Sequence, residues 1–195
     1  MRRIVALLLG MACVVAAPGF AMAAPAERSA TNQRYVDLVI ARALSQRGVP
    51  FSYGGGDVNG PTRGVDRTLP VPTAPAVGGL TPGLSTPAVP AQGLGVVPDS
   101  SANVVGFDAS GLIVYAFAGA GVKMPRSSGE QYKVGQKVLP AQALPGDLIF
   151  YGPEGTQSVA LYLGNNQMIQ GTDPAVAVTP VRTEGMAPYL VRIIA

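Results

Sequence analysis

The chain has 195 residues, of which 48% are hydrophobic and 13% are charged, and its formal net charge is +3. This small excess of basic residues gives no argument for a nucleic-acid-binding protein. The chain contains no histidine, and its one cysteine is Cys13. Zinc therefore lacks its usual ligands, and we expect neither a metal site nor a cofactor.

Residues 1–23 have the layout of a secretory signal peptide. Arg2 and Arg3 precede an apolar run over residues 4–15, and Ala21 and Ala23 supply a small-residue cleavage pattern. We expect cleavage after Ala23, which leaves residues 24–195 as the mature chain. Without cysteine that chain must stay folded in an oxidising compartment without a disulfide.

Two other interpretations of this segment stay open, and both fit less well. The apolar run is shorter than the roughly 20 residues that a spanning helix needs, and Pro18 and Gly19 interrupt its extension. Lipid attachment at Cys13 would need a tetrapeptide that begins with an aliphatic residue and ends at the cysteine, and residues 10–12 match that pattern poorly. The sequence favours an exported protein with no membrane span.

An amphipathic helix is predicted over residues 32–47, where apolar residues recur at helical spacing. Gly48 and Pro50 end it. Residues 50–56 (PFSYGGG) follow, with two aromatic residues beside three glycines. Such a segment predicts a turn whose backbone comes close to another part of the chain.

Residues 66–102 form a proline-rich stretch that is almost free of charge, with prolines at positions 70, 72, 75, 82, 87, 90 and 98. This composition excludes a regular helix or a central strand and indicates an extended insert. We interpret it as a loop inserted in one domain. A segment that docks a partner and a linker between two domains are the alternatives.

Helices and then strands are predicted in the remainder of the chain. A helix over residues 108–120 has Asp108 as its N-cap, Phe107 and Leu112 at staple positions, and glycines at its end. A short helix is predicted over residues 128–134. Five short runs rich in aliphatic and aromatic residues then predict strands over residues 147–151, 158–163, 167–170, 175–178 and 189–194. Helices followed by a strand meander indicate an α+β fold with an antiparallel sheet of about five strands.

The start of the helix at Asp108 is the first candidate site. Backbone N–H groups of its first turn, beside Ser110 and Gly111, can receive an anion or a carbonyl oxygen. A cysteine at position 109 would become reactive there, but the residue is Ala109. The alternative is that Asp108 caps the turn and nothing more happens.

The second candidate site lies on the predicted strand that begins at Ser158. If residues 164–166 form a three-residue hairpin loop, Leu163 pairs with Gln167, and Gln170 shares the face of Ser158. That face offers a hydroxyl and an amide, and neither moves a proton near neutral pH without an adjacent base. Without further information Ser158 is an ordinary surface serine.

Arg126 opens the segment before the short helix, followed by Ser127 and Ser128. Arg126 could hold a carboxylate with two hydrogen bonds while the serines supply donors. The alternative is a solvated surface arginine. Acidic residues are scattered along the chain, so a pair placed for glycoside hydrolysis is a weak alternative.

The segments 106–121, 125–128, 144–152 (LPGDLIFYG) and 158–170 together resemble the NlpC-type cell-wall peptidases, which have a papain-like fold and cut the stem peptides of peptidoglycan. Within this family the mycobacterial Rip proteins, which include a non-catalytic member, are the most similar. The resemblance implies a Cys–His–Glu triad whose positions are held here by Ala109, Ser158 and Gln170. All three depart from the active pattern, and Phe51 stands where many relatives carry a cleft tyrosine.

What the resemblance implies is a cleft that holds a stem peptide without cutting it, in a secreted protein of the cell wall or periplasmic space. Its ligand-binding residues would be Tyr53, Asp108, Ser110, Gly111, Arg126, Ser127, Ser158 and Gln170. Other cell-wall hydrolases are possible partners. Two alternatives stay open, namely a module that binds another envelope protein and an enzyme with a different nucleophile.

Overall fold

The computed structural model describes residues 28–65 and 103–195. The predicted signal peptide and proline-rich insert therefore lie outside the described residues. The helices are α1 (Ala30–Leu44), α2 (Ala109–Ala118) and α3 (Ser128–Lys133). The strands are β1 (Thr62–Arg63), β2 (Val105–Gly106), β3 (Gln136–Val138), β4 (Leu148–Tyr151), β5 (Ser158–Gly164), β6 (Gln167–Gln170), β7 (Ala177–Pro180) and β8 (Leu190–Arg192).

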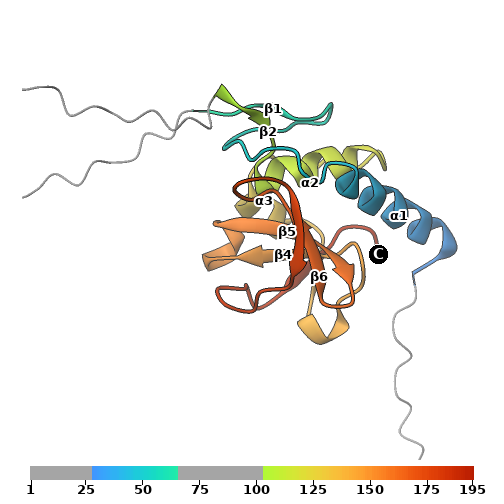
Figure 1. Cartoon of the computed structure of the whole chain (residues 1–195). Coiled ribbons are helices and arrows are strands. Elements are labelled where there is room, and N and C mark those ends of the chain that lie inside the picture. Colours follow the sequence, from blue (N-terminus) through green and yellow to red (C-terminus); the bar gives the residue numbers. More distant parts are fainter. Residues whose placement is uncertain (1–27, 66–102) are drawn as a thin grey trace, which may run out of the picture.

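The main sheet is antiparallel, with six strands in the order β3-β8-β4-β5-β6-β7. Helices α1 and α2 lie along one side of it, and the small sheet of β1 and β2 lies beyond α2 (Figure 1). This arrangement confirms the predicted α+β fold. The sheet has one strand more than predicted, because β3 is short and two of its three residues are exposed polar side chains, which gives no hydrophobic signal.

The predicted element boundaries need small corrections. Helix α1 begins two residues early because the hydroxyl of Ser29 accepts a hydrogen bond from the backbone N–H of Asn32 and caps the helix. Strand β7 was predicted over residues 175–178 and lies at Ala177–Pro180, while Ala175 instead pairs with Pro50. That pairing brings residues 50–56 next to the segment that follows β6. The sequence predicted such a close approach between the backbone of residues 50–56 and another part of the chain.

Alternation along the strands divides the core into two clusters. In β4, Leu148 and Phe150 face the cluster that contains the apolar residues of α1 and α2, whereas Ile149 and Tyr151 face the second cluster on the other side of the sheet. Helix α2 is buried on nearly all sides, because α1 packs on one flank and β5 on the other. Its position in the centre fixes where its first turn points.

The hairpin between β5 and β6 differs from the predicted one in its loop and in the pairing next to the loop. Asn165 and Asn166 have φ of 49° and 56° and form a two-residue turn, which replaces the predicted three-residue loop. Gly164 pairs with Gln167, and the register shifts at Leu163, so the predicted pair of Leu163 with Gln167 is wrong. The irregularity compensates for the shorter loop, and Tyr162 still lies opposite Met168.

A buried carboxylate joins the two ends of the described chain. Asp147 is fully buried and accepts hydrogen bonds from Arg28 at 2.7 Å and from Arg192 at 2.7 and 2.8 Å. Arg28 also donates to the backbone carbonyl of Ile194 at 2.9 Å. The segment before α1, the turn before β4 and strand β8 are therefore held by one ionic cluster.

Candidate functional site

Asp108 organises the start of α2 through both carboxylate oxygens. Its Oδ1 accepts from the backbone N–H of Gly111 at 2.6 Å, as expected for an N-cap, and from the hydroxyl of Ser110 at 3.1 Å. Its Oδ2 accepts from the backbone N–H of Gly54 at 3.0 Å. The cap therefore also fastens the glycine turn of residues 50–56 to the helix.

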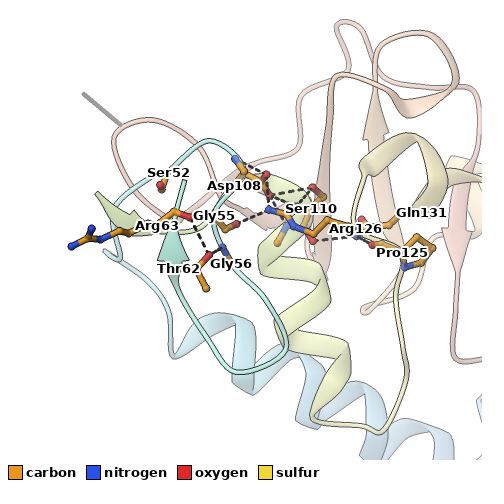
Figure 2. Close-up of polar contacts among 12 residues, drawn as sticks. Ser52, Gly55, Gly56, Thr62, Arg63, Asp108, Ser110, Pro125, Arg126 and Gln131 are labelled. Carbon is orange, nitrogen blue, oxygen red and sulfur yellow. Dashed lines mark hydrogen bonds and ion pairs between the residues drawn. The ribbon is translucent and has the colours of Figure 1, made fainter. Parts of the chain in front are cut away.

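Arg126 completes this network. Nη1 and Nη2 each lie 3.0 Å from one oxygen of Asp108, while Nη1 also donates to Ser110 and Nη2 to the carbonyl of Gly55 (Figure 2). We predicted that Arg126 could hold the carboxylate of a ligand. It holds Asp108 instead, because four of the guanidinium's five N–H groups have partners inside the protein.

Glycines let three backbone segments meet at this point. A Cβ on Gly111 would lie 2.2 Å from the carbonyl oxygen of Gly55, and one on Gly171 would lie 2.6 Å from the carbonyl oxygen of Asp108. No side chain fits at such distances. The glycine turn, the first turn of α2 and the end of β6 are thus in direct backbone contact.

An open cavity of about 600 Å³ lies over the first turn of α2. Ala109 lies on its wall, and six of the predicted ligand-binding residues also line it, namely Tyr53, Asp108, Ser110, Arg126, Ser127 and Ser158. The segments that carry them come from the glycine turn, α2, the start of α3 and the start of β5. The cavity thus brings together residues that are more than 100 positions apart in the chain.

Two predicted site residues do not line the cavity. Gly111 lies in the second layer, where its N–H binds Asp108. Gln170 is 2% exposed, and its side-chain oxygen accepts a hydrogen bond from Arg182 at 3.2 Å. Gln170 therefore has a partner within the protein, on the side of the sheet that carries Met168.

Sequence reasoning also missed part of the wall. Thr156 and Gln157 precede β5, while Thr172 and Asp173 follow β6, and all four line the cavity. A signal was present, since residues next to a candidate strand position lie near it in the fold. Their short polar sequences look like ordinary turns, so nothing in their composition singled them out.

The chemistry available in the cavity is limited to hydrogen bonding and charge. Its wall offers the hydroxyls of six serines and threonines, the hydroxyl of Tyr53, the amide of Gln157, and the charged groups of Asp108, Arg126 and Asp173. None of the lining residues is a cysteine or a histidine.

Among residues 28–65 and 103–195, no helix has the length and hydrophobicity needed to cross a membrane.

A helix whose first turn opens into a polar cavity beside an antiparallel sheet is the arrangement of the papain-like α+β fold. The family model described as "NlpC/P60 family" matches residues 89–195. This match covers more than half of the chain, so the protein belongs to the NlpC/P60 family.

Relatives of known sequence and structure agree with this assignment. Peptidoglycan endopeptidase RipB of Mycobacterium tuberculosis is 47% identical over 167 residues, which are 85% of this chain and 56% of RipB. The solved structure of RipD from M. tuberculosis is 57% identical with a TM-score of 0.62, and the match covers 82% of this chain and 97% of that one. The P60 domain of an M. avium paratuberculosis antigen is 55% identical with a TM-score of 0.64, covering 83% and 95%.

These relatives differ in what they do. RipB is a peptidoglycan hydrolase, whereas RipD is described as a non-catalytic NlpC/p60 domain protein adapted to peptidoglycan binding. The chain spans little more than half the length of RipB and about a quarter of the length of RipA, another endopeptidase that it matches. The family is therefore related to peptidoglycan, and it contains both enzymes and a binding protein.

Proposed function

We propose that this protein is a non-catalytic peptidoglycan-binding protein of the bacterial cell envelope, which holds stem peptides in the cavity over α2. It would be exported and would act as a scaffold or regulator in wall remodelling. The similarity to RipD supports this finer assignment, because RipD is the relative described as having a binding function.

The observation that carries the proposal is the residue at the start of α2. A cysteine at this position would lie beside the positive end of the helix dipole, which favours a thiolate. The residue there is Ala109, and the chain has no histidine at all. We infer that Ala109, Ser158 and Gln170 occupy the positions of the nucleophile, base and orienting residue in the active relatives.

Loss of all three groups removes the thiol mechanism as a whole. A single loss can leave residual activity, but here the thiol, the imidazole and the carboxylate are absent together. The hydroxyl of Ser158 is no substitute, because the cavity wall contains no imidazole that could take its proton. What is kept is a polar cavity braced by the Asp108–Arg126 network, and this supports a binding function.

A sedimentation assay tests the proposal. The purified protein is incubated with insoluble peptidoglycan and centrifuged, and the supernatant is analysed for released muropeptides. We expect protein in the pellet and no released fragments. Ser158→Tyr, which puts a large side chain into the cavity, should lower the pelleted fraction, while Thr183→Tyr at an exposed position outside the cavity should leave it unchanged.

Other outcomes would redirect the assignment. Released fragments would mean that a different nucleophile cuts the wall. Protein that stays in the supernatant without fragments would contradict wall binding and favour a protein partner in the envelope.

A further inference from the structure

Asp173 is a charged residue of the cavity wall that takes no part in the Asp108–Arg126 network. Three lining residues are charged, and two of them, Asp108 and Arg126, form an ion pair at 3.0 Å. Asp173 is exposed, and no described residue is bonded to its carboxylate. The wall therefore carries a net charge of about −1 on a chain whose overall charge is positive.

The backbone on both sides of Asp173 fixes its place at the rim. On one side, Gly171 packs directly against the backbone of Asp108 and Ala109, where an added Cβ would meet atoms at 2.6 to 3.1 Å. On the other side, the carbonyl of Pro174 accepts a hydrogen bond from the backbone N–H of Phe51 at 2.9 Å. The carboxylate is thus presented on an anchored segment beside the start of α2.

Hydrogen-bond donors and a negatively charged acceptor therefore lie on neighbouring parts of the cavity wall. The first turn of α2 offers backbone N–H groups, which favour a carbonyl oxygen or a carboxylate. Asp173 offers a negative charge, which favours a cation. Because Arg126 is already bound to Asp108, the carboxylate of Asp173 is free to pair with a cationic group of a ligand.

We propose that Asp173 makes the cavity selective for peptides that carry a free primary ammonium group, so that uncross-linked stem peptides bind in preference to cross-linked ones. This inference rests on the proposed function. A cross-link converts the side-chain amine of one of the two joined stem peptides, the one that supplies the nitrogen, into a neutral amide, which removes from that peptide the charge that Asp173 would pair with. The protein would then distinguish stem peptides with a free side-chain amine from those with an acylated one through the carboxylate of Asp173.

Two synthetic stem tetrapeptides that differ by one acetyl group test this inference. Both are acetylated at the N-terminus; one has a free side-chain amine at its diamino acid residue, and in the other that amine is acetylated as well. Titration of the purified protein should give a Kd for the free amine that is about two- to fivefold lower, the range expected for a solvent-exposed ion pair. The preference should shrink as salt is added.

Variants assign the preference to the residue. Asp173→Asn should bind both peptides with nearly equal affinity, while Glu184→Gln removes the same charge from an exposed position outside the cavity and should keep the preference. Equal binding of both peptides by the unmodified protein, or an unchanged preference in Asp173→Asn, would overturn the inference. Failure to bind either peptide would overturn it as well. If the protein then still sediments with peptidoglycan, wall binding survives, and if it does not, the proposed function falls too.

Discussion

At the scale of single residues, Arg126 shows how a side chain that looks available for a ligand can be committed to the protein. Its side chain is 42% exposed, and yet its guanidinium holds Asp108, Ser110 and the carbonyl of Gly55. Its exposure suggests a group that binds ligand, whereas its hydrogen bonds within the protein show that it supports the cavity wall. Its contribution to binding is therefore expected to be indirect.

Arg126→Ala should lower the free energy of unfolding by about 1 kcal/mol, because an exposed ion pair contributes at most about that much. Arg34→Ala is the matched control, since Arg34 is exposed on α1 and away from the cavity, and it should change stability by less than about 0.5 kcal/mol. Urea unfolding measures both. A loss as small as that of the control would show that the network does not stabilise the fold.

The triad positions lead to a prediction about regained activity. Ala109→Cys combined with Ser158→His should cleave peptidoglycan weakly or not at all, because the imidazole would lack a carboxylate to orient it. Adding Gln170→Glu should raise cleavage, since residue 170 is buried and is already fixed by Arg182. Release of soluble muropeptides measures the activity, and strong cleavage by the double variant alone would contradict the prediction.

At the scale of elements, the site depends on how closely β6 ends against α2. Gly171 makes this contact, and its φ is not in the region that requires glycine, so the restriction comes from space alone. The atoms in the way belong to the backbone of Asp108 and Ala109, which cannot move without displacing the helix start. The position of the cavity floor is therefore set by a residue without a side chain.

Gly171→Ala should destabilise the protein by about 1–3 kcal/mol, the cost of overpacking a rigid contact. The same change at Gly129 in α3 serves as the control. There the nearest atom to an added Cβ is a methyl carbon of Thr156 at 3.1 Å, which can give way. Gly171→Ala should lower the melting temperature and weaken stem-peptide binding, and Gly129→Ala should do neither. Equal effects of the two changes would argue against the backbone contact.

At the scale of the whole molecule, the cluster around Asp147 holds the ends of the described chain together. Hydrogen bonding to Asp147 raises the pKa of Arg192 above its ordinary value, so this arginine stays charged at every pH of interest. Arg28 adds a second positive charge that is 4% exposed. The carboxylate is the compensating charge that the structure places between these two arginines.

Asp147→Asn should therefore cost about 3–5 kcal/mol, because two buried cations lose the charge that compensates them. The comparison is Asp37→Asn on the exposed face of α1, which should be nearly neutral. Chemical denaturation measures both free energies. A loss below about 1 kcal/mol for Asp147→Asn would show that the cluster is better solvated than its burial indicates.

The sequence by itself determined the three helices, strands β4 to β8 and the residue chemistry. Val159, Leu161 and Leu163 alternate along β5 and defined its faces, Asp108 marked the start of α2, and Ala109 showed the absence of a thiol, because all of these depend on local pattern and composition. The predicted loop and the pair next to it were wrong, but Tyr162 still lies opposite Met168, because the buried face of β5 favours that arrangement.

The tertiary structure alone decided which polar groups are free. It paired Arg126 with Asp108, turned Gln170 toward Arg182, and left Asp173 unpaired at the rim. These outcomes depend on contacts between segments 12 to more than 60 positions apart, such as that of Arg126 with Gly55. No local pattern encodes them, since the strength of each hydrogen bond depends on the distance and direction that the whole fold imposes.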